Sequence, residues 1–470
     1  MSALVTVAVV VLVLFSLLAT FLPIAVMMAL LPGMIKASQE RERRRDSLWR
    51  AVGAELGGRG SSQGIEASVD GRALQVKTRV VSTGKSSSTY TDVHLQGVCL
   101  GLSLAPQNFL SGVFGGTDHR VGDRAFDDRV VVGGDERVIG LLGHGTRQEL
   151  LRCPYTVRVA DGRLTLTASG AVGDGEALRG QIAWARRLAG QLAGTPQTMP
   201  EHLAAVAVAD PVAGVRRRSL EVLRACSPAQ AEAVAATVLD DADGAVRVTA
   251  AGIVGRSDIL LAVVGDAQEP ESLRILALEA VRGQGVEAGV RLVAANGSPR
   301  LWRTAALACP AVGTTEAAVA LGSLAPLLAP AAWPSERKQR AVYVVAARAV
   351  AESLGQLPHA PEAEDLLLQL LLVDDTETVS SALRSLGAVG TVRSVQGLNG
   401  VVDGAGILTG LGGEARKAVR AIQARAGGER GGVALAARGV GGLALPERSA
   451  KQDTARAAAS ARTREAQREG

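Results

Sequence analysis

One pattern recurs through the second half of the chain. A small or acidic loop residue is followed about six positions later by an apolar residue and an arginine, and then by a helix rich in Ala and Leu. The two clearest copies run from Asp210 to Arg216 and from Asp241 to Arg247. Looser copies of the pair lie at Leu273-Arg274, Trp302-Arg303, Gln339-Arg340, Val379-Ser380 and Ala415-Arg416. Successive pairs are 27 to 40 residues apart, a period typical of one helical hairpin repeated along a chain.

Such hairpins also fit the composition. Apolar residues make up 47% of the chain, but aromatic residues only 3%, so the core consists mainly of Ala, Val and Leu. Small aliphatic side chains let helices approach closely, and a hairpin that cannot bury its apolar face alone buries it against the next hairpin. We therefore expect residues 200–425 to form an all-α stack with an extended surface, and an α-bundle without repeats is the alternative.

The acidic and basic residues of the pattern predict a structural ladder. An aspartate at a helix start accepts backbone N–H groups, which contributes about 1 kcal/mol. The arginine in the first turn can then reach the acid of the same or the next repeat. The predicted ladder residues are Asp210, Arg216, Asp241, Arg247, Arg274 and Arg303.

These residues resemble the HEAT-repeat family, in particular the short bacterial HEAT-like repeats. In that family a loop Asp and a helix Arg six positions later link neighbouring repeats; Asp374 has the same spacing to Ser380, where the base is missing. The turn from Leu386 to Gly390 is similar to the Leu-Gly-x-x-Gly turn of the family. The likeness implies an α-solenoid over residues 200–425 that acts as a protein-binding scaffold. Some relatives attach or remove tetrapyrrole chromophores, but no residue set for that chemistry occurs here.

Two further features bear on this assignment. The Trp/Leu-Gly/Tyr pattern of a tetratricopeptide array is absent, which disfavours that repeat type. Pro326, Pro330 and Pro334 would interrupt a helix, so we expect a loop insertion there, and the repeat register is open between about residues 300 and 370.

The N-terminal segment predicts a membrane anchor over residues 3–31. No charged side chain occurs before Lys36, and the 20 residues from Ala3 to Leu22 are almost all apolar. At about 1.5 Å per residue they match a hydrocarbon layer of about 30 Å. A cleaved signal peptide would carry basic residues before a shorter apolar run; a buried core helix is a further alternative.

Basic residues follow the apolar run. The segment 36–50 carries six basic and three acidic side chains, and its basic residues next to the apolar run are Lys36, Arg41, Arg43, Arg44 and Arg45. The bias of such charges toward the inside of the cell predicts a single pass through the inner membrane, with the bulk of the chain in the cytoplasm.

Residues 51–194 predict a small α+β domain with no recognised family. Asp70-Gly71 and Asp161-Gly162 each separate two extended runs, a strong hairpin signal. Residues 126–132 are expected to form a strand. Residues 175–192 form an amphipathic helical pattern that would close the domain.

No catalytic, cofactor-binding or metal-binding motif stands out in this domain. Gly84-Lys85-Ser86 resembles the end of a phosphate-binding loop, but Arg79 stands where that motif requires glycine. Several acidic and histidine residues lack regular ligand spacing and are more typical of solvated turns; they are Asp118, His119, Asp123, Asp127, Asp128 and His144. The four cysteines have no paired spacing.

Residues 426–470 predict a low-complexity or disordered tail. The Gly-rich runs that begin at Gly431 and Gly441 are nearly identical, and they favour a linker over a strand pair.

Three functions follow from these observations. The first is a membrane-anchored protein-interaction scaffold without catalysis or cofactor. The second is an enzyme, with an unrecognised site in the α+β domain or a HEAT-like lyase activity. The third, a nucleic-acid-binding solenoid, is disfavoured because residues 197–425 carry 21 basic but 24 acidic side chains, whereas phosphate binding requires a basic stripe.

Overall fold

The computed structural model describes residues 33, 35–37, 39–84, 86–107, 118–170, 174–281, 283, 285–404, 410–428, 434–435 and 443–444. These residues belong to two compact units, which divide between Val238 and Leu239. A sheet comes first along the chain and many helices follow, an order compatible with the predicted α+β domain and helical array.

The first unit contains an eight-stranded sheet in the order β1-β2-β3-β4-β8-β7-β5-β6. Its strands are β1 (Arg59–Ser61), β2 (Gly64–Val69), β3 (Arg72–Ser82), β4 (Ser87–Gln96), β5 (Leu102–Pro106), β6 (Val130–Gly134), β7 (Thr156–Ala160) and β8 (Arg163–Ser169). All neighbouring strands are antiparallel.

Both predicted hairpins are confirmed. β2 pairs with β3 around Asp70 and Gly71, whose φ angles are 52° and 74°. β7 pairs with β8 around Asp161 and Gly162, at 51° and 72°. Two successive positive φ angles match the right-handed twist of the flanking strands, which explains the Asp-Gly preference.

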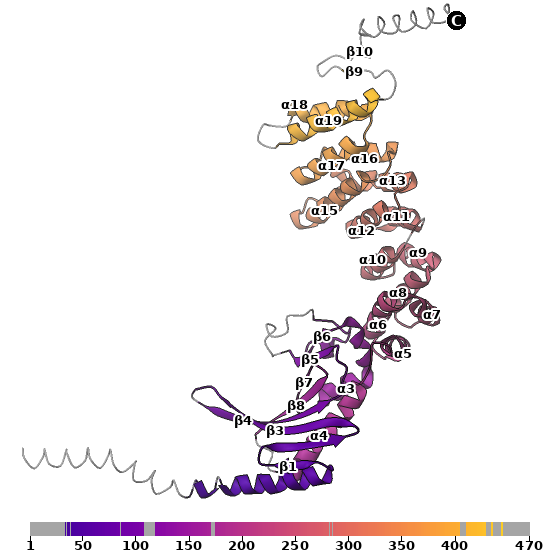
Figure 1. Cartoon of the computed structure of the whole chain (residues 1–470). Coiled ribbons are helices and arrows are strands. Elements are labelled where there is room, and N and C mark those ends of the chain that lie inside the picture. The colour runs from indigo at the N-terminus through magenta and orange to yellow at the C-terminus, as the bar shows by residue number, and fades with distance from the viewer. Residues whose placement is uncertain are drawn as a thin grey trace, which may run out of the picture. The chain divides into compact units, whose positions relative to one another are not determined.

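The predicted amphipathic helix is also confirmed, as α4 (Gly175–Gln191). Its apolar stripe is almost completely buried and consists of Leu178, Ile182, Ala185, Leu188, Ala189 and the C-cap Leu192. The helix packs on β4 and β8 (Figure 1), where Val93 and Leu166 are fully buried. Strand alternation thus directs one face of the sheet toward α4.

The predicted strand over residues 126–132 is wrong in its first half. Asp123 accepts a hydrogen bond from the Phe126 N–H and caps the short helix α2 (Arg124–Asp127), and only then does β6 begin. The apolar residues of this run suggested a strand throughout, but the N-cap Asp123 favours a helical turn before the strand. The helix η1 (Glu136–Leu141) and the helix α3 (His144–Arg152) follow.

Three further helices belong to the first unit: α5 (Met199–Ala209), α6 (Ala213–Cys226) and α7 (Pro228–Thr237). α5 packs on η1, where a Cβ atom on Gly140 would lie 3.0 Å from Leu203. The start of the predicted helical array, near residue 200, therefore lies within the same compact unit as the sheet.

A helix covers residues 39–55, in and after the predicted basic segment. Trp49 and Val52 of this helix are each 1% exposed and anchor it to the first unit. The predicted membrane anchor at residues 3–31 lies outside the described residues. None of the helices among the described residues combines the length and the hydropathy needed to cross a membrane.

The second unit consists of helices in two rows. The first row is α8 (Gly244–Val254), α10 (Glu271–Ala280), α12 (Pro299–Ala308), α15 (Arg337–Leu354), α17 (Thr376–Val389) and α19 (Leu411–Gly428). The second row is α9 (Ser257–Gly265), α11 (Gly285–Asn296), α13 (Thr315–Gly322) and α16 (Pro361–Leu370), and α18 (Val395–Gly404) packs on α19. Each helix contacts the next helix of its row (Figure 1), and the buried side chains between them form one continuous apolar core.

The recurring apolar–Arg pair lies near the start of a helix in every copy. Those helices are α6 in the first unit and the six first-row helices of the second. The copy at Gln339-Arg340 is exposed on both residues, because α15 begins about two turns before its buried part. Ala347 is fully buried there and Arg348 follows it, so this pair occupies the equivalent position.

The predicted loop insertion is confirmed. Between α13 and α15 the chain forms only the short helices α14 (Ala325–Leu328) and η3 (Pro330–Ala332). In the predicted tail, β9 (Ala434–Leu435) and β10 (Leu443–Ala444) form an antiparallel pair, so the preference for a linker over a strand pair is wrong at these four residues.

Candidate functional site

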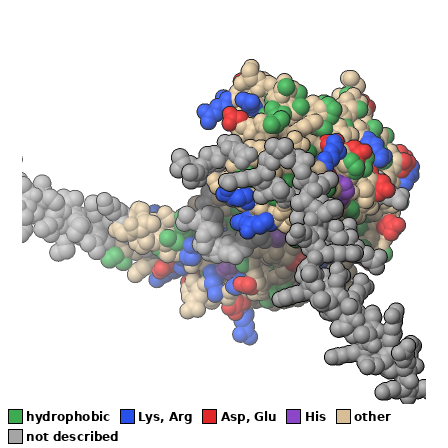
Figure 2. All heavy atoms as spheres, turned by 90° about the horizontal axis from the view of Figure 1, so that it is seen from above, with side chains coloured by type: hydrophobic (Ala, Val, Ile, Leu, Met, Phe, Trp, Pro, Cys, Tyr) green, Lys and Arg blue, Asp and Glu red, His purple; other side chains and the backbone are tan. Residues whose placement is uncertain are grey.

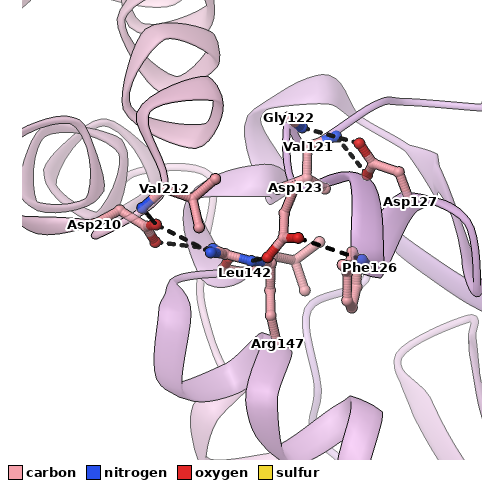
Figure 3. A network of polar contacts seen from close by, with 9 residues as sticks. All are labelled: Val121, Gly122, Asp123, Phe126, Asp127, Leu142, Arg147, Asp210 and Val212. Carbon is pink, nitrogen blue, oxygen red and sulfur yellow. Dashed lines mark hydrogen bonds and ion pairs between the residues drawn. The ribbon is translucent and has the colours of Figure 1, made fainter. Parts of the chain in front are cut away.

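A buried ion cluster centres on Arg147 of α3 in the first unit (Figure 3). The Arg147 side chain is 0% exposed, and its Nη1 and Nη2 atoms donate to the Asp210 carboxylate at 2.8 and 3.0 Å. Its Nε donates to Asp123 at 2.9 Å, and Nη1 also donates to the Leu142 carbonyl at 2.7 Å. Burial alone lowers the pKa of a guanidinium, but these carboxylates hold the pKa of Arg147 above its usual value.

The loop beside this cluster is held by backbone contacts. The Asp127 carboxylate accepts hydrogen bonds from the N–H groups of Val121 and Gly122 at 3.0 and 3.1 Å. Gly122 has a φ of 97°, and a Cβ atom there would lie 2.3 Å from the carbonyl oxygen of Gly214 in α6. The charged groups of the Arg147 cluster face one another inside the protein. The cluster therefore joins two parts of the first unit and does not present a charged group to a substrate.

The two clearest Asp-to-Arg motifs have the same local geometry. Asp210 accepts from the Val212 N–H at 3.0 Å, and Asp241 accepts from the Asp243 N–H at 2.8 Å. Arg216 then donates to the Asp210 carbonyl at 2.7 Å, and Arg247 donates to the Asp241 carbonyl at 2.8 Å. Each of these contacts tightens the loop that precedes its helix.

The other two predicted ladder residues, Arg274 and Arg303, have different surroundings. Arg274 is 6% exposed and donates to the carbonyls of Val264 and Asn296 at 2.9 and 3.0 Å, so it links α10 to the ends of α9 and α11. Arg303 is exposed on α12 and lines a groove.

A ladder that the sequence analysis missed connects neighbouring repeats of the second unit. A helix N-cap residue bonds to a charged side chain 27 residues earlier in four places: Ser298 to Glu271, Thr314 to Glu287, Asp375 to Arg348 and Thr391 to Glu364. The partners lie on successive helices of one row, or at the start of η4 (Val392–Ser394) before α18. The equal spacing indicates translational order between repeats. In the sequence, the ladder could be recognised from N-cap residues that follow a charged residue at a fixed distance.

The predicted juxtamembrane residues lie on or just before the helix over residues 39–55. Arg44 pairs with Glu40 at 2.8 Å in an exposed contact, and the Arg45 guanidinium lies 5.4 Å from the Trp49 ring centroid. Lys36, Arg41 and Arg43 are exposed. These three side chains can therefore contact anionic groups, whereas Arg44 is paired and Arg45 is partly buried.

The side chains considered as metal ligands are separated. No group of three or more His, Cys, Asp or Glu residues with ligand geometry occurs within the described ranges. Asp123 and Asp127 belong to the buried cluster, His119 bonds to the Gly134 carbonyl, and Asp128 pairs with Arg124. Gly84 lies between the paired strands β3 and β4 with a φ of 78°, so it belongs to a hairpin turn.

Three thiols have raised pKa values, which disfavours nucleophilic catalysis by them. Burial raises the pKa of the Cys309 thiol to about 12 and also raises the pKa of Cys153 and Cys226. Burial lowers the pKa of the His94 imidazole, which bonds to Thr165 at 3.0 Å on the sheet. A thiol held protonated is a poor nucleophile.

The groove lined by Arg303 is a candidate binding site in the second unit. It lies between α10 and α12 and has a volume of about 630 Å³. Its walls are mostly aliphatic, and its described lining residues are Ile275, Glu279, Val281, Gly283, Val286, Arg300, Arg303, Thr304, Leu307, Ala308, Ala311 and Val312. Of these, the sequence analysis singled out only Arg303.

Comparison with protein-family models, with curated proteins and with solved structures finds no match for this chain.

Proposed function

We propose that this protein is a scaffold that binds another protein through the helical array of its second unit, without catalysis. The single observation that carries the proposal is the groove between α10 and α12, because its lining combines aliphatic and charged side chains. Grooves between helices commonly accept peptide segments that place apolar side chains into the groove.

The ladder supports the same proposal. Bonds between residues 27 positions apart recur in both helix rows, as expected if one structural unit is stacked repeatedly. We assign the array to the HEAT-like class of helical repeats on this order together with the Asp-to-Arg motifs. Repeats of this kind create extended surfaces whose residues vary without disturbing the core.

The distribution of charged side chains supports a protein partner over nucleic acid. Figure 2 shows Lys and Arg side chains interspersed with Asp and Glu side chains on the visible face. Several arginines of the array are already used within the fold, as Arg274 and Arg348 illustrate. A phosphate backbone would require a continuous basic surface.

The proposal includes a membrane anchor at residues 3–31. The apolar composition of that segment and the basic residues after it support a single pass through the inner membrane, with both units in the cytoplasm. Reporter fusions at the C-terminus test this topology. Activity of a reporter that works only in the periplasm would overturn it.

Quantitative affinity capture from detergent extracts tests the scaffold function. The full chain is compared with a chain that lacks residues 239–428, which leaves the first unit complete. We expect one protein in a fixed ratio to the full chain and its loss from the shortened chain. Retention of the same protein by the shortened chain, or capture of nothing in a fixed ratio, would refute the scaffold role of the array.

A further inference from the structure

The groove has one wall that is both apolar and basic. Arg300, Arg303, Thr304 and Leu307 line it at helical spacing along α12. Leu307 is 59% exposed although it is large and aliphatic. Leu307 lies one helical turn from Arg303. The wall therefore offers an apolar contact and a charge contact at a fixed separation.

Of the two arginines that the structure describes on this wall, Arg303 is the one without an ion pair. Arg300 pairs with Glu271 at 3.6 Å, and Glu279 on the opposite wall has an interaction of its own within the chain. Arg303 is exposed, and it forms no ion pair with any other residue that the structure describes. Its guanidinium can therefore donate hydrogen bonds to a carboxylate without breaking an ion pair among the described residues.

We propose that the groove between α10 and α12 binds a protein segment with aliphatic side chains and an acidic side chain, which pairs with Arg303. This inference rests on the proposed scaffold function and adds the chemistry of the partner. Charge complementarity selects an acidic segment, and the aliphatic walls formed by residues such as Ile275, Val286 and Leu307 select apolar neighbours of the acid.

The shape of the site favours a protein segment. A space between two helices has a direction along which an extended or helical segment can lie. Its volume of about 630 Å³ accommodates several side chains at once. A segment one or two turns long would place an acid against Arg303 and an aliphatic side chain against Leu307.

The test is a selection of displayed random dodecapeptides on the purified full chain in detergent. Selected peptides are synthesised with a fluorescent label, and their affinity is measured by anisotropy. We expect enrichment of peptides with Asp or Glu among Leu, Ile and Val. Arg303→Glu should weaken their binding about tenfold or more, and Leu307→Asp should weaken it comparably.

Matched controls lie outside the groove. Arg291→Glu changes an exposed arginine on α11, and Leu372→Asp changes a leucine that is 77% exposed. Both variants should bind the selected peptides as the original chain does. Circular dichroism of all four variants establishes that the helices are retained.

Three results would overturn the inference. They are a selection that yields no peptides, selected peptides without acidic enrichment, and affinities that Arg303→Glu and Arg291→Glu reduce equally. If the selected peptides instead depend on another part of the second unit, the groove assignment fails but the scaffold function stands. If the affinity capture also yields no protein in a fixed ratio, both proposals fail.

Discussion

The Arg147 guanidinium forms a two-point ion pair with the Asp210 carboxylate, at 2.8 and 3.0 Å, between side chains that are 0% and 1% exposed. Asp210 ends α5 and Arg147 lies on α3, so the pair joins the first helices after residue 200 to the sheet-containing part of the same unit. The aspartate that defines the first repeat motif therefore has a partner 63 residues earlier in the chain.

The first prediction concerns this pair. Arg147→Met would leave Asp123 and Asp210 buried without their cation, and the loss of one partner of a buried ion pair typically costs about 3–5 kcal/mol. We expect a large fall in the denaturant concentration at the midpoint of unfolding of the first unit. The fluorescence of Trp49 and Trp184 monitors this unfolding. Arg186→Met is the control, because the Arg186–Asp70 pair has similar geometry but is about half-exposed, and it should leave the midpoint nearly unchanged. Equal effects of the two substitutions would contradict the structural role of Arg147.

The second prediction concerns the contact of Gly122 with Gly214. A Cβ atom on Gly214 would lie 2.3 Å from the Gly122 carbonyl oxygen, so Gly214→Ala forces the backbone to move. We expect destabilisation by about 1–3 kcal/mol, as in other overpacked sites. Gly190→Ala in α4 is the matched control, since no atom lies within 4 Å of its Cβ position, and alanine there should be neutral or stabilising. Chemical denaturation of both variants measures the difference, and a neutral Gly214→Ala would argue against the close contact.

The sequence predicted the elements whose signals are local. The Asp-Gly turns identified two hairpins, the stripe from Leu178 to Leu192 identified α4, and the recurring pair marked the start of the first-row helices other than α15. In α15 the pattern was placed about two turns too early, because the helix continues beyond the part that the neighbouring helices bury.

The candidate site was less predictable because it depends on contacts between distant segments. Arg147 follows a Gly-rich turn and has no sequence neighbour that reveals its burial. Asp123 resembled a solvated turn residue, yet it accepts a hydrogen bond from Arg147, which lies 24 residues later in the chain. The groove also depends on the relative placement of α10 and α12, which no local pattern encodes.

The third prediction concerns acid stability of the second unit. Burial by itself raises the pKa of the Glu364 carboxyl, but hydrogen bonds from Ser394 and Thr391 outweigh it, so the folded-state pKa lies below the usual 4.5. A lowered carboxyl pKa contributes stability that is present above about pH 4.5 and is lost as the pH falls through the folded-state value.

Thermal unfolding of the full chain from about pH 7 to pH 3 measures this contribution. The original chain should lose stability in the acid range more steeply than Glu364→Gln, which removes the titrating group. The exposed Glu362, in the same helix turn, supplies the control substitution Glu362→Gln. Identical pH profiles for the original chain and Glu364→Gln would show that this carboxylate does not contribute as described.

The fourth prediction concerns the ladder with its spacing of 27 residues. Thr314 caps α13 and donates to Glu287 of the preceding repeat. A double-mutant cycle with Thr314→Val and Glu287→Gln should give a coupling energy of about 1 kcal/mol. The same cycle with the exposed Glu316 in place of Glu287 should give a coupling near zero. A negligible coupling in the first cycle would remove the ladder as a link between repeats.

Site-specific photocross-linking in cells tests the central claim most directly. A photoreactive amino acid replaces either Thr304, which lines the groove, or the exposed Leu372, which does not. The account predicts one adduct of defined mass with a protein at position 304, its loss when Arg303→Glu is added, and no such adduct at position 372. Absence of an adduct at position 304, or the same adduct at both positions, would contradict a protein-binding groove between α10 and α12.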